Sequence, residues 1–119
     1  MTNGETQMKK FVVLYHAPLS AVEQMASATP EQAKAGMDAW MTWSHKAGEA
    51  IIDLGAPLEQ ITQGTENTNN GNGSGTTVGY SILQANTEEE ILTLLQDHPH
   101  LHTPGGSIEV LATLPIPGA

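Results

Sequence analysis

The sequence predicts a single α+β domain in which four strands and two main helices follow one another in the order βαββαβ. A length of 119 residues fits one domain with one core. Helix-capping residues precede two stretches, which we expect to be helical at 29–46 and 87–98. Runs rich in β-branched and aromatic residues predict strands at 9–15, 51–62, 78–85 and 107–114.

The first strand, 9–15, carries apolar residues on both of its alternate faces, so we expect it to be covered on both sides. A short helix can follow at 21–28. Thr29 then caps the first long helix, with Gln32 completing a capping box. The period of this helix predicts an inward stripe of Ala33, Met37, Trp40, Met41 and Ser44.

The second half of the chain begins with a strand at 51–62, in which Gly55 and Pro57 predict a bulge or an edge strand. Residues 63–77 are polar and glycine-rich, and we interpret them as a flexible linker or a mobile lid. Thr87 and Glu90 predict a second capping box, and Pro99 ends that helix.

Right-handed crossovers place these strands in one antiparallel sheet of order 4-1-3-2, with both helices on a single face. This is a ferredoxin-like arrangement. The other face would expose Val, Leu and Ile across four strands, which is a larger apolar patch than soluble monomers usually carry. We therefore expect a homodimer that pairs through the uncovered sheet face.

The composition excludes several classes of partner. The chain has four Lys, no Arg and 13 acidic residues, which gives a net charge of −9. Because cationic contacts to phosphate dominate affinity for nucleic acids, we expect no nucleic-acid partner. Without Arg, an anionic ligand would depend on Lys, His, backbone N–H groups or a helix N-terminus. The absence of cysteine excludes disulfides and thiol nucleophiles and fits a reducing compartment.

No segment predicts secretion or insertion into a membrane. Residues 1–7 are polar and patternless, and we expect a disordered leader before a domain that spans 8–119. The N-terminus lacks an apolar h-region, and no run of roughly eighteen apolar residues occurs. We therefore expect a cytoplasmic protein that has no membrane partner.

Three segments together resemble the YCII-related (DGPF/YciI-like) family: KKFVVLY at 9–15, LGAPL at 54–58, and HPHL at 98–101 followed by GGSIEV at 105–110. The resemblance implies a ferredoxin-like protomer and a dimeric α/β barrel, without one settled activity. The DGPF tetrapeptide is absent here. The stretch 35–39 also lacks the helix histidine that one branch of the family pairs with an Asp, so that dyad is not transferred.

The predicted topology gathers four of the five histidines at one rim, beside the cleft between sheet and helices. His16 ends the first strand there, next to the segment His98–His102. An imidazole at a cleft mouth suits general acid or base chemistry, although His16 can equally be a strand-end residue bonded to backbone. We assign catalytic roles to His16, His100 and Asp38, the last because it lies closest to the helix site that the resemblance implies.

An extended H-x-H-x-H segment would project His98, His100 and His102 to one side, where they could bind Zn, Cu or Ni with Asp97 or His16. The alternative is a polar helix end favoured by the helix dipole. We assign no metal site and expect no cofactor. The residues assigned to ligand binding are Tyr15, Trp43, His98, His102 and Tyr80.

Two further side chains have open alternatives. Trp40 lies on the inward stripe and is expected in the core, whereas Trp43 is nearer the stripe edge and would face a partner subunit or a pocket. Glu109 either faces the dimer interior, where burial would raise its pKa, or is exposed and paired with a Lys.

These observations predict a small homodimeric domain that binds a small organic molecule in a cleft near the end of the first strand, with histidine-mediated acid/base chemistry. Two alternatives come from other classes. One is a non-catalytic accessory or regulatory module, and the other is a weak metal-binding protein that uses His98–His102.

Overall fold

The computed structural model describes residues 8–61 and 76–117, so the predicted leader at 1–7 and most of the predicted glycine-rich loop lie outside the described residues. The strands are β1 (Lys9–Ala17), β2 (Ile51–Pro57), β3 (Thr76–Ala85) and β4 (Ser107–Ala112). The α-helices are α1 (Ala21–Ser27), α2 (Pro30–Ala47) and α3 (Glu88–Leu95), and two short 3₁₀ helices are η2 (Gly48–Ala50) and η3 (Pro99–His102).

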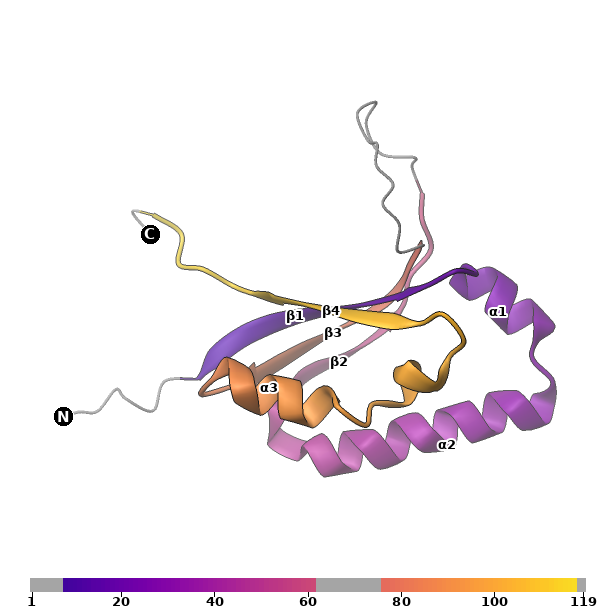
Figure 1. Ribbon diagram of the computed structural model, residues 1–119, viewed down its shortest axis with the longest axis horizontal. Coiled ribbons are helices and arrows are strands. Elements are labelled where there is room, and N and C mark those ends of the chain that lie inside the picture. Colours follow the sequence, from indigo (N-terminus) through magenta and orange to yellow (C-terminus); the bar gives the residue numbers. More distant parts are fainter. Residues whose placement is uncertain (1–7, 62–75, 118–119) are drawn as a thin grey trace.

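The four strands form one sheet in the order β2-β3-β1-β4, and every neighbouring pair is antiparallel. This confirms the predicted order 4-1-3-2. Figure 1 shows α2 and α3 lying on the same side of the sheet. Residues of β1 alternate between buried and half-buried, because the buried set faces the helices and the other set faces away. We call these the helix face and the open face of the sheet.

Local capping explains where the helices begin. Ser20 and Thr29 each form a complete capping box before α1 and α2. Thr87 accepts a hydrogen bond from the N–H of Glu90, but the Glu90 carboxylate accepts one from Asn86 N–H at 3.0 Å. The predicted second box is therefore only half formed, because the carboxylate reaches one residue further back.

Strands β2 and β4 end earlier than predicted, at Pro57 and Ala112. The bulge predicted at Gly55 is confirmed, since the register of β2 against β3 shifts between Asp53 and Ala56. Gly55 has a φ of 93°, and a Cβ built there would lie 1.6 Å from the carbonyl oxygen of Tyr80. Only glycine can occupy this position without displacing β3.

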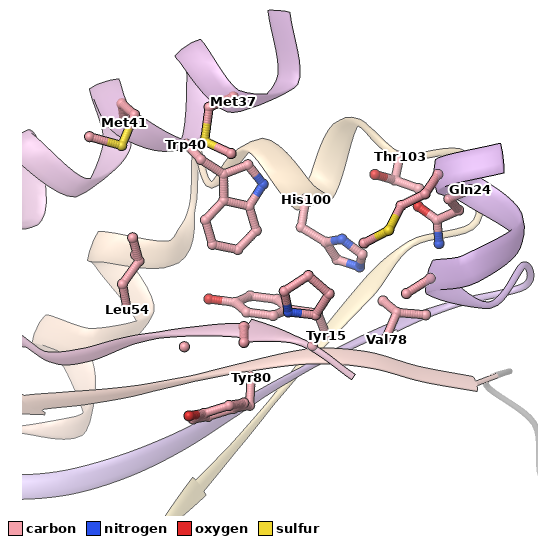
Figure 2. Close-up of a pocket in the computed structure, with 16 residues that line it drawn as sticks. Tyr15, Gln24, Met37, Trp40, Met41, Leu54, Val78, Tyr80, His100 and Thr103 are labelled. Carbon is pink, nitrogen blue, oxygen red and sulfur yellow. The ribbon is translucent and has the colours of Figure 1, made fainter. Parts of the chain in front are cut away.

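The predicted inward stripe of α2 is directed toward the sheet at Met37, Trp40 and Met41, which line a pocket there (Figure 2), but its predicted burial was wrong. Met37 and Met41 are 62% and 43% exposed, and the buried residues of this helix are Trp43 and Ala47. Residues 30–39 are all exposed, so only the C-terminal part of α2 packs into the core. The reason is that a space, described below, separates the N-terminal part of α2 from the sheet.

The core is formed between the helix face of the sheet and the helices. Its largest fully buried members are Phe11, Tyr15, Leu83 and Ile91, together with one histidine, His98. A histidine this deep is unusual, because an imidazole has two nitrogens that normally need partners.

Within the described residues, no helix is long and apolar enough to cross a membrane.

Candidate functional site

A pocket of about 340 Å³ lies between the helix face of the sheet and helices α1 and α2 (Figure 2). Strands β1, β2 and β3 form its floor, and the residue at the centre of that floor is Tyr15. Its volume falls in the range of small-molecule sites. The sixteen lining residues are Tyr15, Ala21, Gln24, Met25, Met37, Trp40, Met41, Leu54, Gly55, Ala56, Pro57, Val78, Gly79, Tyr80, His100 and Thr103.

Among residues 8–61 and 76–117, the lining is mostly apolar and includes no Lys, Asp or Glu. Three methionines from the part of the chain that the structure describes line it: Met25 from α1, and Met37 and Met41 from α2. Methionine side chains are flexible and polarisable, so they can adjust to ligands of different shape. The pocket is therefore suited to an uncharged and largely apolar ligand.

Tyr15 holds the floor of this pocket through a buried hydrogen-bond chain. The Ser81 hydroxyl donates its proton to the carbonyl oxygen of Leu54 at 2.6 Å, so Tyr15 OH donates to Ser81 Oγ at 2.7 Å. Burial raises the pKa of Tyr15 to about 12, which outweighs the opposite effect of the Ser81 bond. Tyr15 consequently stays protonated at neutral pH, and it contributes to the floor of the pocket and does not act as a catalytic base.

His98 lies behind the pocket and is fully buried. Its ring centroid is 4.9 Å from that of Tyr15, 4.5 Å from that of Trp40 and 4.4 Å from that of Trp43. Its Nδ1 accepts a hydrogen bond from the N–H of His100 at 2.9 Å, which assigns the proton of the neutral ring to Nε2. Within the described residues, Nε2 has no hydrogen-bond partner.

This aromatic surrounding determines the charge of His98. Desolvation, the largest effect, together with the nearby His100, lowers its pKa to about 4, against a smaller opposite effect of Asp97. The ring is therefore neutral at pH 7. It does not line the pocket, and it supports Tyr15 and Trp40, which do.

His100 is the histidine that lines the pocket. Its Nε2 donates a hydrogen bond to the carbonyl oxygen of His16 at 2.8 Å, so the neutral ring keeps a free lone pair on Nδ1. Figure 2 shows the ring beside Tyr15 and Thr103. An imidazole held in one tautomer at the wall of an apolar pocket can accept a hydrogen bond or a proton from a bound molecule.

The four predicted rim histidines do not share one environment. The backbone of His16 contacts His100, but the side chain of His16 lies on the open face, with the sheet between the two rings. The segment 99–102 is a 3₁₀ helix and not extended, so its histidines diverge. His102 is exposed, whereas His98 and His100 are buried. In residues 8–61 and 76–117, no group of three or more His, Cys, Asp or Glu is arranged to hold a metal ion.

The remaining predicted site residues are dispersed. Asp38 is exposed on α2 and bonded to Lys34 at 3.1 Å, away from the pocket lining. Trp43 is 3% exposed and donates from Nε1 to the carbonyl oxygen of Leu94, so it is a core residue. The side chain of Tyr80 points away from the pocket (Figure 2), and a hydrogen bond to Asp53 raises its pKa.

The methionines of the pocket were not identified as site residues from the sequence. A methionine in a predicted helix is usually interpreted as a core residue or as an isolated exposed apolar residue. The available signal was their spacing: Met37 and Met41 are four residues apart and lie on one helix side.

No protein-family model matches the chain, and a comparison with curated proteins also finds no match.

Proposed function

We propose that the protein binds a small, uncharged and largely apolar organic molecule in the pocket between the sheet and helices α1 and α2. The observation that carries this proposal is the methionine-lined pocket, whose described lining includes no Lys, Asp or Glu and holds one oriented imidazole. A ligand hydroxyl or amine would donate a hydrogen bond to His100 Nδ1, while its apolar part would lie against Tyr15 and Trp40.

His100 also supplies a reason to expect modest acid/base chemistry. With Nε2 engaged by the carbonyl of His16, the free Nδ1 can remove a proton from a bound molecule and later return it. A non-catalytic binding module would use the same contacts. Turnover separates the two, so compounds that raise the melting temperature should be incubated with the protein and their products analysed.

Binding to the pocket is tested with N-phenyl-1-naphthylamine, an uncharged fluorescent probe. Met25→Glu places a charge in the apolar lining and is expected to weaken binding at least about tenfold, because the carboxylate must be desolvated or the probe excluded. Val22→Glu is the matched control. Val22 lies on the same helix with a similar exposure, 53% against 60% for Met25, but it does not line the pocket.

The probe experiment has a clear failing outcome. Equal weakening by both substitutions, or unchanged binding by the Met25 variant, would place the probe outside the pocket. Met41→Glu on α2 gives an independent second test from the opposite wall of the same space.

We further propose that the chain belongs to the YCII-related family, as a ferredoxin-like protomer in a homodimer. The sheet order and the position of α2 and α3 on one face support this proposal. Apolar residues also gather on the open face, where no described element covers them: Val12, Leu14, Ile82 and Leu111. A second copy that packs sheet against sheet would remove this surface from water.

The dimer is tested by light scattering at micromolar concentration. The unmodified chain is expected to have twice its sequence mass, and Leu14→Glu is expected to be a monomer because it places a carboxylate in the middle of the apolar surface. Leu92→Glu on α3, where the side chain is 54% exposed, is the control and should remain a dimer. A monomeric unmodified chain would refute the proposed dimer and leave the pocket proposal intact.

A further inference from the structure

Three polar side chains from three adjacent strands meet on the open face of the sheet. His16 lies on β1, Thr77 is its register partner on β3, and Glu109 is a diagonal neighbour on β4. Nε2 of His16 is 2.8 Å from Glu109 Oε1, and Nδ1 is 3.2 Å from Thr77 Oγ1. None of these three side chains lines the pocket on the helix face.

A β-bulge produces this arrangement. Tyr80 points to the open face, so strict alternation would turn Thr77 toward the helices. The register of β1 against β3 shifts between Tyr15 and His16, which leaves Val78 as an extra residue on β3. Val78 and Gly79 are consecutive buried residues, and Thr77 is thereby turned to the side of His16. Bulges commonly redirect a side chain in this way near functional sites.

The hydrogen-bond partners of His16 determine which of its ring nitrogens donates and which accepts. A carboxylate can only accept, so His16 Nε2 donates to Glu109. The neutral ring then has its lone pair on Nδ1, which accepts from the Thr77 hydroxyl. A carboxylate that holds an imidazole in the tautomer needed to deprotonate a hydroxyl is the relation that defines nucleophilic triads. In serine proteases Nδ1 donates to the carboxylate and Nε2 accepts from the hydroxyl. Here the roles are reversed, because Nε2 donates to Glu109 and Nδ1 accepts from Thr77.

We infer that Thr77, His16 and Glu109 form a second site, in which Thr77 is an activated hydroxyl that accepts short acyl groups from activated esters. Thr77 Oγ1 attacks the ester carbonyl carbon while His16 Nδ1 takes the hydroxyl proton. The bond from that carbon to the leaving oxygen then breaks, and the same proton passes to the leaving oxygen. An acyl-threonine remains, which water hydrolyses to the carboxylic acid by the same base.

The burial of the three residues agrees with this role. The side chains of His16 and Glu109 are 14% and 50% exposed, so the base is sheltered while the carboxylate remains hydrated. Thr77 is half-buried, which limits the acyl group to a short one. The site uses only residues of one chain and does not depend on the proposed pocket ligand. It lies on the open face, where Glu109 is the register partner of Leu14, so the acylation of Thr77 requires that this end of the face stays accessible beside the proposed second subunit.

The test uses p-nitrophenyl acetate on the full chain, followed by intact mass and peptide mapping. We expect a gain of one acetyl group on the peptide that contains Thr77, with release of p-nitrophenolate. Thr77→Val should abolish this modification and Thr77→Ser should retain it. Thr76→Val is the matched control, because Thr76 is the adjacent residue of the same type, and it should leave the labelling unchanged.

His16→Gln removes the base and is expected to slow acetylation of Thr77 about 100-fold. Glu109→Gln is expected to slow it less, since it removes the group that holds the tautomer and leaves the base. Melting curves of each variant separate loss of the relay from loss of the fold. Acetyl groups found only on Lys, His or the N-terminal amine, or equal labelling in the Thr77→Val and unmodified chains, would overturn the inference.

Discussion

Acidification from pH 7 to about pH 4 is expected to lower the free energy of unfolding by up to about 3 kcal/mol through His98 alone. The folded protein holds this ring neutral with a pKa of about 4, whereas an unfolded chain has the ordinary value of 6.5. Between these values the unfolded chain binds a proton that the folded chain does not. Stability is therefore complete above pH 6.5 and falls toward pH 4, at about 1.4 kcal/mol per pH unit at the limit.

The measurement is urea unfolding at a series of pH values between 7 and 4. His98→Asn is the informative variant, because an Asn oxygen can replace Nδ1 as the acceptor for the N–H of His100 and cap η3 while it removes the titration. The variant should be less stable at pH 7, since the ring leaves a cavity, but its stability should vary much less across this range.

Two comparisons isolate the contribution of His98. His102→Asn changes an exposed histidine of the same segment and should keep the full pH dependence. A hydrogen bond from Lys46 lowers the pKa of the neighbouring Asp97 below its ordinary value of 3.8. The contribution of this ion pair to stability is therefore lost only at a pH below the range of the measurement. A slope that persists in the His98 variant would show that another group causes it, and a flat curve for the unmodified chain would contradict the neutral, buried ring.

Trp43→Ala is expected to lower the free energy of unfolding by about 4 kcal/mol. Trp43 is 3% exposed, its Nε1 donates to the carbonyl oxygen of Leu94 at 3.1 Å, and its ring contacts His98. The substitution removes the hydrogen bond between α2 and the end of α3 and leaves the partly buried carbonyl of Leu94 without its side-chain donor.

Trp40→Ala is the matched comparison. The two tryptophans are three residues apart on the same helix, but Trp40 is only half-buried and lines the pocket. We expect a smaller loss of stability and a larger loss of probe binding. Chemical unfolding of both variants decides the order. If Trp43→Ala does not fold, Trp43→Phe, which keeps a ring but loses the N–H donor, should still cost more than Trp40→Phe.

Equal losses of unfolding free energy in the Trp43→Ala and Trp40→Ala variants, or a larger loss for Trp40→Ala, would contradict this expectation. Such a result would support the core position of Trp40 that the helical period predicted. The predicted stripe illustrates why the burial of α2 could not be derived from its sequence. Positions 40 and 43 are close together on a helix, and a pattern of apolar residues does not reveal which edge of the stripe meets the sheet. The decisive factor is the space between α2 and the sheet, which exposes the methionines.

The histidines show the same limit at the candidate site. Their proximity along the backbone could be predicted, because the end of β1 and the segment before β4 lie side by side. The face on which each ring lies could not. A bulge sets the direction of Thr77 beside His16, and the 3₁₀ turn of η3 separates the directions of His98 and His102. Both are local deviations, of one residue in the bulge and four residues in η3, that a periodic pattern does not reveal.

The sequence by itself determined the α+β class, the approximate positions of the strands and of α2 and α3, and the order of the sheet. These follow from local physics: capping residues, glycine and proline at boundaries, and apolar periodicity act within a few residues of one another. Only the tertiary structure decided which tryptophan is buried, which histidine is neutral and where the pocket lies. Those properties depend on desolvation by residues distant in the sequence, as when Tyr15, Trp40 and Trp43 together enclose the ring of His98.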